Sequence, residues 1–269
     1  MEKIALITGA ASGIGLALAG EAARDGYSLL LVDKNSAGLQ QATDGIKQRY
    51  PDIRISFLAA DLSRNETVGE ILNKIKETGA YVSMLINCAG FGVYGNFFET
   101  VWERELEMIS VHIETPTRLI KEYLPGMIKN GEGYILNVAS LAGFIPGPVM
   151  AVYYATKAYL ISFSRAVAAE LRGTGVSIAV LCPGVTHTGF SRTVHGKTAG
   201  IAKSGSLSAT AESVARYGYR SLKKGRIVVI PGLVNKILYS FQRIFPSSVV
   251  VRMVKRSQER IGRSVQRDI

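Results

Sequence analysis

Seven short apolar runs, separated almost everywhere by helical patterns, constrain the fold more than any other feature of this chain. The runs are continuous rather than alternating, which is typical of parallel strands covered on both faces. Strands that alternate with helices form a doubly wound sheet through right-handed crossovers. The sequence therefore predicts an α/β fold with a seven-stranded parallel sheet flanked by helices. The runs occupy residues 4–8, 28–32, 53–58, 82–86, 133–138, 176–181 and 226–230.

The length of the chain fits one such unit. It has 269 residues, and α/β folds often reach ~250 residues as a single domain. We expect a catalytic domain over residues 1–231 and a helical extension over residues 232–269. The polar, glycine-containing region 189–209 is predicted to be a mobile loop.

The stretch "TGAASGIG", Thr8 to Gly15, directly follows the first run and opens a helix. Its glycines permit a tight turn and let the backbone approach a pyrophosphate, which sits at the positive end of the helix. Asp33 lies 20 residues after Gly13, where an acidic residue binds a ribose hydroxyl. That carboxylate repels a 2′-phosphate, so NAD is favoured, although Lys34 would attract the phosphate of NADP. A purely structural turn is the alternative.

The same N-terminal residues also mimic a signal peptide with a cleavage site at Ala17–Ala19. Glycine and serine interrupt the apolar run, so we favour a folded motif and a cytoplasmic protein. No apolar run reaches the ~18 residues of a membrane span.

Tyr153 and Lys157 lie four residues apart in the stretch "YYATK", within a predicted helix. Hydride transfer from an alcohol to a nicotinamide needs a base, and tyrosine is a poor one because its unperturbed pKa is ~10. A lysine one helical turn away favours the phenolate through its charge. Ser140 ends the preceding strand, where α/β sheets place their ligands, and can hydrogen-bond the reacting oxygen. Tyr154 has the wrong spacing to Lys157, and we expect it only to pack.

These motifs, with "NCAG" at 87–90 and "PGVTHT" at 183–188, resemble the short-chain dehydrogenase/reductase family over roughly residues 3–230. The resemblance implies a single Rossmann-type domain, an NAD(P)-dependent oxidoreductase and a homo-dimer or homo-tetramer. It gives Ser140, Tyr153 and Lys157 the same roles, with Lys157 also holding the nicotinamide ribose. The expected cofactor-binding residues are Thr8, Gly9, Ser12, Gly13, Ile14, Gly15, Asp33, Lys34, Asp61, Leu62, Asn87, Ala89, Gly90, Tyr153, Lys157, Pro183, Gly184, Val185 and Thr188.

His112 departs from the family, whose pattern places an asparagine there to complete the catalytic group. Pro116 has no N–H, so the helix should kink and the His112 carbonyl should lose its partner. That carbonyl can hold a water, or the imidazole can relay protons with an unperturbed pKa near ~6.5. A histidine that only fills space is the third possibility. If the imidazole relays protons, His112→Asn should flatten a neutral inflection in the pH–rate profile.

A helix is predicted around His112. Thr100 and Glu103 fit a capping box at its start. A core stripe is expected, and His112 falls off it. The stripe comprises Leu106, Ile109, Ile113, Ile120, Leu124 and Met127.

Apolar side chains follow several predicted strand ends and suggest an apolar substrate pocket. The substrate would then be a secondary alcohol or ketone of fatty-acyl, steroid-like or similar character. Ordinary core and rim packing is the alternative. The candidate pocket residues are Phe91, Tyr94, Leu141, Phe144 and Phe190.

The C-terminal extension is amphipathic and basic. Residues 232–269 contain eight lysines and arginines against two acids, a large share of the net charge of +11. The tail resembles that of a family subgroup assigned lipid-like or fatty-acyl substrates. A substrate cover, a peripheral membrane helix and packing against the body or a partner subunit all fit.

Two further function classes fit the sequence less well. A nucleotide-binding regulator with little catalysis would share the fold, but the intact Ser140, Tyr153 and Lys157 argue against it. A nucleic-acid binder has only the charge in its favour, because no recognition motif is present. Cys88 and Cys182 lie in apolar runs and form no disulfide framework, and no metal site is expected.

Overall fold

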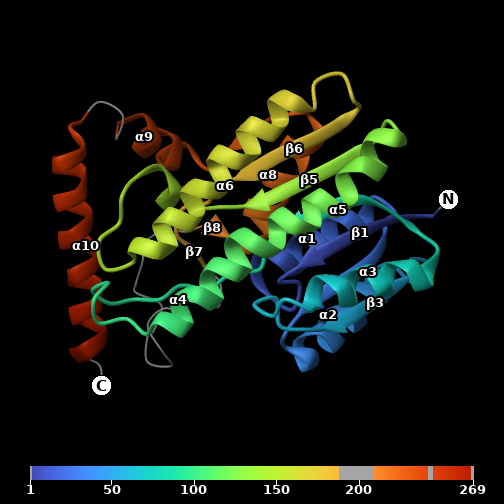
Figure 1. The fold of residues 1–269 in the computed structure, drawn as a ribbon, viewed down its shortest axis with the longest axis horizontal. Coiled ribbons are helices and arrows are strands. Elements are labelled where there is room, and N and C mark those ends of the chain that lie inside the picture. Colours follow the sequence, from blue (N-terminus) through green and yellow to red (C-terminus); the bar gives the residue numbers. More distant parts are fainter. Residues whose placement is uncertain (1, 188–208, 242–244, 268–269) are drawn as a thin grey trace.

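The computed structural model describes residues 2–187, 209–241 and 245–267. A seven-stranded parallel sheet lies between two layers of helices, which confirms the predicted fold (Figure 1). The strands are β1 Lys3–Thr8, β2 Ser28–Asp33, β3 Ile55–Ala59, β4 Tyr81–Asn87, β5 Gly133–Val138, β6 Val176–Leu181, β7 Thr186–His187, β8 Ala209–Thr210 and β9 Val228–Val229. The helices are α1 Gly13–Arg24, α2 Ser36–Arg49, α3 Thr67–Thr78, α4 Trp102–Ile109, η1 Ser110–Glu114, α5 Thr115–Lys129, η2 Leu141–Phe144, α6 Ala151–Glu170, α8 Ala211–Lys223, α9 Leu233–Phe241 and α10 Ser247–Arg267.

The order of the strands fixes where a ligand can bind. The sheet runs β3-β2-β1-β4-β5-β6-β9, so the chain leaves β1 in one direction and returns to β4 on its other side. In such sheets the ligand binds beyond the carboxyl ends of the strands at this switch point. β1 and β4 end at Thr8 and Asn87, which are paired in the ladder.

The strands are buried on both faces, as their continuous apolar sequences predict. In β1, Ala5 and Ile7 pack in one core cluster, while Ile4 and Leu6 pack in another on the opposite face. The first cluster includes residues of α1, α2 and α8, and the second includes residues of α3, α5 and α6. The two helical layers therefore cover the sheet completely, and only its edges and strand ends remain for binding.

The last strand of the sheet is shorter than predicted. Only Val228 and Val229 of the run 226–230 pair with β6. A two-residue parallel ladder between β7 and β8 was not predicted, because two residues are too few to give a periodic pattern. The predicted mobile loop 189–209 lies outside the described residues except for Ala209, which begins β8.

The predicted capping box is wrong. α4 begins at Trp102 with Val101 as its N-cap, and no side-chain cap bond is present at this described terminus. The Thr100 hydroxyl donates instead to the carbonyl of Phe97, within the preceding turn.

The predicted core stripe is right for α5 and out of phase for α4. Ile120 and Met127 are buried, but Leu106 is 47% exposed and His112 is only 1% exposed. The π-helical turn η1 lies between the two halves, where the Thr115 N–H donates to the Ser110 carbonyl. Such a turn adds one residue to the helical path. The halves therefore differ in phase by about one residue, roughly 100° in an α-helix of 3.6 residues per turn.

The extension forms two helices, α9 and α10, at one end of the molecule (Figure 1). α9 contacts the body through Tyr239, whose ring lies 4.5 Å from that of Phe144. Among the described helices, none is both long enough and apolar enough to cross a bilayer.

Gly175 tests the close approach of β5 and β6. Its φ is +79°, and a Cβ there would lie 2.0 Å from the carbonyl oxygen of Gly131. We expect Gly175→Ala to lower the free energy of unfolding by about 3 kcal/mol or more, measured by urea denaturation. Gly173 is the matched control, because its φ is +81° and none of the described atoms lies within 4 Å of such a Cβ.

Gly173→Ala should therefore cost only the left-handed conformation, about 1–2 kcal/mol. Equal losses in the two variants would contradict a backbone clash at Gly175.

Candidate functional site

Thr8 joins the two strands at the switch point. Its hydroxyl accepts hydrogen bonds from the N–H groups of Cys88 and Ala89, at 3.1 and 3.3 Å, and donates to the Ile86 carbonyl. A hydroxyl has one donor and two acceptor sites, so this side chain is fully used within the protein. Thr8 was predicted to bind cofactor. Because its hydroxyl is already fully hydrogen-bonded, such a contact would have to come from its backbone.

The glycine-rich turn has the shape of a phosphate cradle. Gly9 and Gly13 have φ values of +67° and +57°. A Cβ on Gly9 would lie 2.7 Å from the backbone of Ala89, and one on Gly15 would lie 2.0 Å from the Gly9 carbonyl oxygen. Within the described residues, Ser12 makes no side-chain cap bond to the first turn of α1. The amides of that turn can therefore face an anion, which fits a dinucleotide pyrophosphate.

Asp33 stands at the end of β2 beside this turn. Its carboxylate accepts hydrogen bonds from the N–H groups of Ala11 and Asn35, at 3.2 and 3.0 Å. It is therefore fixed where the sequence predicts a ribose contact. Asp61 is exposed, and hydrogen bonds from Ser63, together with the nearby charge of Lys34, lower the pKa of its carboxyl group. Leu62 is buried beside it.

Ser140, Tyr153 and Lys157 meet at the carboxyl end of β5. Ser140 hydrogen-bonds the Tyr153 hydroxyl, and the Lys157 Nζ lies 5.7 Å from the centroid of the Tyr153 ring. The Lys157 ammonium donates to the Val138 carbonyl at 3.1 Å. The sequence thus predicted a group of side chains that the fold does bring together.

Burial sets the pKa values of this group. Burial raises the pKa of Tyr153 above its usual value, and the Ser140 hydrogen bond only partly opposes that shift. Burial also lowers the pKa of Lys157 to about 8. The i, i+4 spacing predicted that the lysine charge favours the phenolate. In this structure desolvation dominates instead, so the neutral phenol is favoured.

The loop before α6 is strained where it delivers Tyr153. Val149 has a φ of +60°, although a β-branched residue is rarely found there. Its carbonyl accepts a hydrogen bond from the Gly95 N–H at 2.9 Å. Such outliers are held in place by surrounding structure and are common at functional sites. No sequence pattern predicted the strained backbone at Val149.

His112 is buried and hydrogen-bonded through both ring nitrogens. Nε2 accepts from the Phe91 N–H at 3.1 Å, and Nδ1 lies 2.9 Å from the Thr156 hydroxyl. That hydroxyl donates to the Tyr153 carbonyl, so it accepts from an Nδ1–H. Burial and the Lys157 charge lower the pKa of His112 well below its usual value. The neutral ring therefore links Phe91, which directly follows the "NCAG" segment, to the helix that carries Tyr153.

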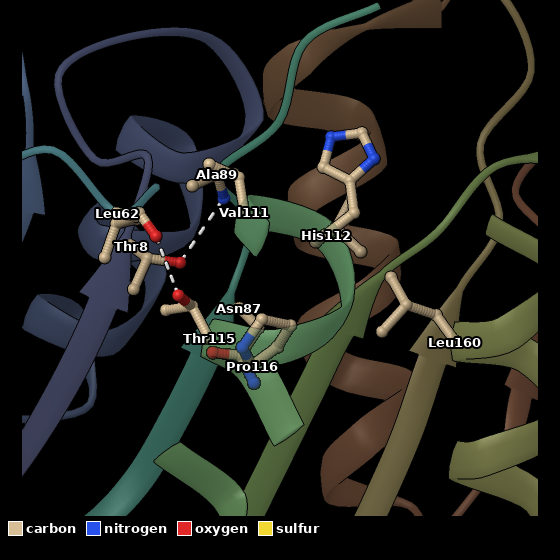
Figure 2. Close-up of a pocket in the computed structure, with 10 residues that line it drawn as sticks. Thr8, Leu62, Asn87, Ala89, Val111, His112, Thr115, Pro116 and Leu160 are labelled. Carbon is tan, nitrogen blue, oxygen red and sulfur yellow. Dashed lines mark hydrogen bonds between the residues drawn. The ribbon is translucent and has the colours of Figure 1, made fainter. Parts of the chain in front are cut away.

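A small cavity lies beside His112. Its volume is about 10 Å³, room for about one water molecule, so it cannot hold a substrate. It is bounded by His112 of the π-helical turn, by Pro116 in the first turn of α5, and by Thr8 and Asn87 at the strand ends (Figure 2). The predicted water-binding carbonyl of His112 belongs to this region and stays a prediction.

Asn87 takes part in a buried polar chain that the sequence did not reveal. Its amide donates to Asn137, whose own amide donates to Ser164, each at 2.9 Å. Within the described part of the chain, the Asn87 Oδ1 has no hydrogen-bond partner. The "NCAG" segment ends in a glycine because a Cβ on Gly90 would lie 2.7 Å from the His112 Nε2.

The predicted substrate residues fall into two groups. Phe91 and Tyr94 pack with Tyr153 in one apolar cluster, which also contains Met108 and Met150. Leu141 and Phe144 pack in another, beside Tyr239 of α9. Phe190 and Thr188 lie outside the described residues. Of the expected nicotinamide contacts, Pro183 accepts from the Leu141 N–H, Gly184 lies against Asn235, and Val185 is 74% exposed.

The C-terminal helix α10 reaches this site, which the sequence could not establish. The Gln258 amide donates to the Tyr154 hydroxyl at 2.9 Å, and the Tyr94 hydroxyl donates to the Gln258 carbonyl at 3.0 Å. Val254 packs against the cluster that contains Tyr153. The extension therefore covers the side of the site where an apolar substrate is expected.

Comparison with known proteins decides the family, since a model described as short chain dehydrogenase matches residues 3–199. The chain belongs to the short-chain dehydrogenase family. The very-long-chain 3-oxoacyl-CoA reductase of Coprinopsis cinerea is 33% identical over 180 residues, 65% of this chain and 52% of that protein. This match spans about half the length of that relative. The ketoacyl reductase HetN of Nostoc is 30% identical over 258 residues, 92% of this chain and 86% of that protein.

A solved structure agrees with the fold and the family. The short-chain dehydrogenase from Sphingobium yanoikuyae, in complex with NADPH, has a TM-score of 0.77 at 25% identity, over 91% of this chain and 97% of that one. The predicted family and oxidoreductase class are thus confirmed. The predicted nicotinamide cofactor agrees with this relative.

The role of His112 can be tested by its pH dependence. Because its pKa is lowered in the folded state, the unfolded chain binds the proton first, and stability falls as the pH drops below ~6.5. We expect His112→Asn to lose less stability between pH 7.5 and 5.5 than the wild type does, measured by urea denaturation. The shape of its pH–rate profile near neutrality should not change, because the ring is already neutral there.

This expectation replaces the flattened profile that a side-chain relay would give. Loss of a wild-type inflection near pH 6.5 in the variant would restore the relay.

Proposed function

We propose that this chain is an NAD(P)-dependent oxidoreductase that transfers hydride between the nicotinamide and an apolar secondary alcohol or ketone. One observation carries the proposal: the Ser140 hydroxyl, the Tyr153 phenol and the Lys157 ammonium converge at the carboxyl end of β5. The glycine-rich turn after β1, where Gly9 and Gly13 have positive φ, supports the cofactor part of the proposal.

The chain's own residues hold and orient the reactants. The turn Gly9–Gly15 and Asp33 would bind the pyrophosphate and the adenosine ribose, and Lys157 the nicotinamide ribose. When bound, the nicotinamide supplies or accepts the hydride. Tyr153 donates a proton to the carbonyl oxygen in reduction and takes it back in oxidation, while Ser140 orients that oxygen by hydrogen bonding.

Reduction of a ketone is the direction that the site supports best. Burial raises the pKa of Tyr153, so the phenol keeps its proton and is ready to act as a general acid. Burial lowers the pKa of Lys157 to about 8, so its ammonium is still largely charged near neutral pH. The Coprinopsis and Nostoc relatives are named as reductases, and the Sphingobium one as a dehydrogenase.

An apolar substrate is supported by the lining of the site. Met108 and Met150 pack in one apolar cluster with Tyr153, and Phe91, Tyr94 and Val254 of α10 pack against this cluster. The relatives named above act on 3-oxoacyl-CoA and ketoacyl compounds by name. A fatty-acyl or similarly extended ketone fits this lining, with the extension over residues 232–269 as its cover.

Two finer points of the proposal concern assembly and location. A homo-dimer or homo-tetramer is expected from the family, and the cytoplasm is the expected location.

A regulator that binds nucleotide without turnover is the alternative function. It predicts tight cofactor binding and no formation or loss of reduced nicotinamide with any ketone.

Tyr153→Phe separates these two functions. Without the phenol the proton has no donor, so we expect kcat to fall by about a hundredfold to ten-thousandfold. Binding of reduced cofactor, followed by its fluorescence, should be preserved. The assay is oxidation of NADH or NADPH with a panel of long-chain 3-ketoacyl thioesters and steroid ketones.

Tyr154→Phe is the matched control, since the hydrogen bond that the Tyr154 hydroxyl makes with the described residues is the one that it accepts from Gln258. It should keep most of the activity. Full activity in Tyr153→Phe, or equal losses in both variants, would refute the assigned mechanism.

Asp33 should set the choice of cofactor. A carboxylate beside the ribose repels a 2′-phosphate, so we expect the wild type to prefer NADH over NADPH. Asp33→Asn should raise the ratio of kcat/KM for NADPH over that for NADH about tenfold or more, because one tenfold step needs only ~1.4 kcal/mol of repulsion.

Asp61→Asn removes the same charge from the next strand end and should change this ratio far less. A wild type that prefers NADPH, unaffected by Asp33→Asn, would overturn the assignment.

A further inference from the structure

The apolar stripe of α9 faces the solvent, whereas a helix that only packs on its own domain would turn this stripe toward the core. An amphipathic surface helix normally turns its apolar face to the core. In α9 every large aliphatic or phenylalanine side chain is exposed, with Leu233 at 73% and Ile237 at 57%. Their spacing of i, i+1, i+4, i+5 and i+8 forms one continuous stripe. The stripe consists of Leu233, Val234, Ile237, Leu238 and Phe241.

The opposite face of α9 holds the helix to the body. The Asn235 side chain lies against Gly184 and donates to the Pro231 carbonyl at 2.7 Å. The ring of Tyr239, one turn further on, contacts that of Phe144, with the centroids 4.5 Å apart and the planes inclined at 57°. The outward direction of the apolar stripe is therefore fixed by specific contacts on the other side.

α10 shows the same arrangement with added charge. Val254 and Gln258 face the body. Val249 and Met253 are exposed, Met253 at 63%. The side of the helix away from Val254 also carries the exposed basic residues Arg252 and Arg256. The exposed apolar residues of α9 and α10, together with the exposed Phe245, are called the C-terminal apolar surface below.

A third segment adds aromatic side chains at the same end of the molecule. The chain before α4 approaches α10 through the bond from Tyr94 to Gln258 (Figure 1). It then continues to Phe97, Phe98 and Trp102, which are 64%, 84% and 57% exposed. Phenylalanine and tryptophan are the side chains that amphipathic membrane-surface elements bury at the bilayer interface.

The charge distribution distinguishes between two occupants of this surface. The described side chains of α9 and α10 include four cations, Lys236, Arg252, Lys255 and Arg256, and one anion, Glu259. Lys255 pairs with Glu259 at 3.8 Å. Two copies meeting through this surface would bring like charges together, which disfavours a self-contact. An anionic bilayer complements both the cations and the apolar stripe.

We propose that the C-terminal apolar surface docks peripherally on an anionic lipid bilayer. The apolar stripe of α9 enters the headgroup region, and the arginines of α10 contact lipid phosphates and carboxylates. Docking of this kind needs no spanning helix. It also places α10, the cover over Tyr94 and Tyr154, against the membrane. Binding to lipid is independent of the proposed reaction and is measured without cofactor or substrate.

The test is co-sedimentation of the full chain with vesicles. We expect binding to phosphatidylcholine vesicles that contain phosphatidylserine, much weaker binding to phosphatidylcholine alone, and a loss of binding as salt is added. Ile237→Glu and Phe241→Glu should each weaken binding about tenfold or more, because a charge replaces an apolar group that would be buried in the bilayer. Both positions are more than half exposed, so the fold should tolerate the changes.

Ile128→Glu is the matched apolar control. Ile128 is 42% exposed near the end of α5, far from α10 (Figure 1). It should bind vesicles like the wild type.

The electrostatic part has its own pair of variants. Arg252→Gln combined with Arg256→Gln should weaken binding about fivefold for each arginine removed. Lys47→Gln combined with Arg49→Gln on α2 removes the same charge elsewhere and should have little effect. Circular dichroism and urea midpoints check that each variant is folded.

Three results would overturn the proposal. The first is a wild type that does not sediment with the anionic vesicles. The second is an equal effect of Ile128→Glu and Ile237→Glu. The third is a dimer, seen by sedimentation velocity, that Phe241→Glu dissociates while lipid binding is absent, which would assign the surface to a second copy of the chain.

Discussion

The site depends on the hydroxyl of Thr8. It ties the end of β1 to the N–H groups of Cys88 and Ala89 after β4, across the point where the direction of the sheet reverses. Parallel neighbours are joined by no hairpin, and the Thr8 hydroxyl extends the connection between β1 and β4 beyond their last ladder pair, Thr8 and Asn87. The glycine-rich turn and the "NCAG" segment are thereby held against each other, and a Cβ at Gly9 would not fit between them.

Burial sets the protonation states of the side chains gathered at the end of β5. Lys157 and Tyr153 are both pushed toward their neutral forms, and His112 is held neutral between Phe91 and Thr156. Such a site stores unfavourable desolvation that the surrounding hydrogen bonds must offset. His112 links the loop after β4 to α6 through a ring that does not need to titrate. These two hydrogen bonds favour a histidine that braces the site over one whose side chain relays protons.

Local sequence patterns predicted what short-range physics decides. The strands, the glycine-rich turn and the spacing of Tyr153 and Lys157 followed from hydrophobic periodicity and helical geometry. The inward position of His112 did not, because the π-helical turn η1 shifts the phase of the helix by one residue, and no periodic pattern encodes that insertion. The strain at Val149 and the polar chain from Asn87 to Ser164 depend on contacts distant in sequence, so they too were invisible.

The C-terminal extension shows the limit of periodicity from another side. The sequence predicted correctly that the extension is amphipathic, but an apolar stripe alone does not say whether it faces the core or the solvent. Asn235 and Tyr239 decide the matter, since their contacts bind the polar face of the helix to the body. Gln258 does the same for α10 by hydrogen-bonding Tyr94 and Tyr154, which pack in one cluster with Tyr153. The side chains that turn the apolar surface outward therefore also place α10 over the cluster that contains Tyr153, so the proposed docking on lipid and the proposed access of substrate depend on the same contacts.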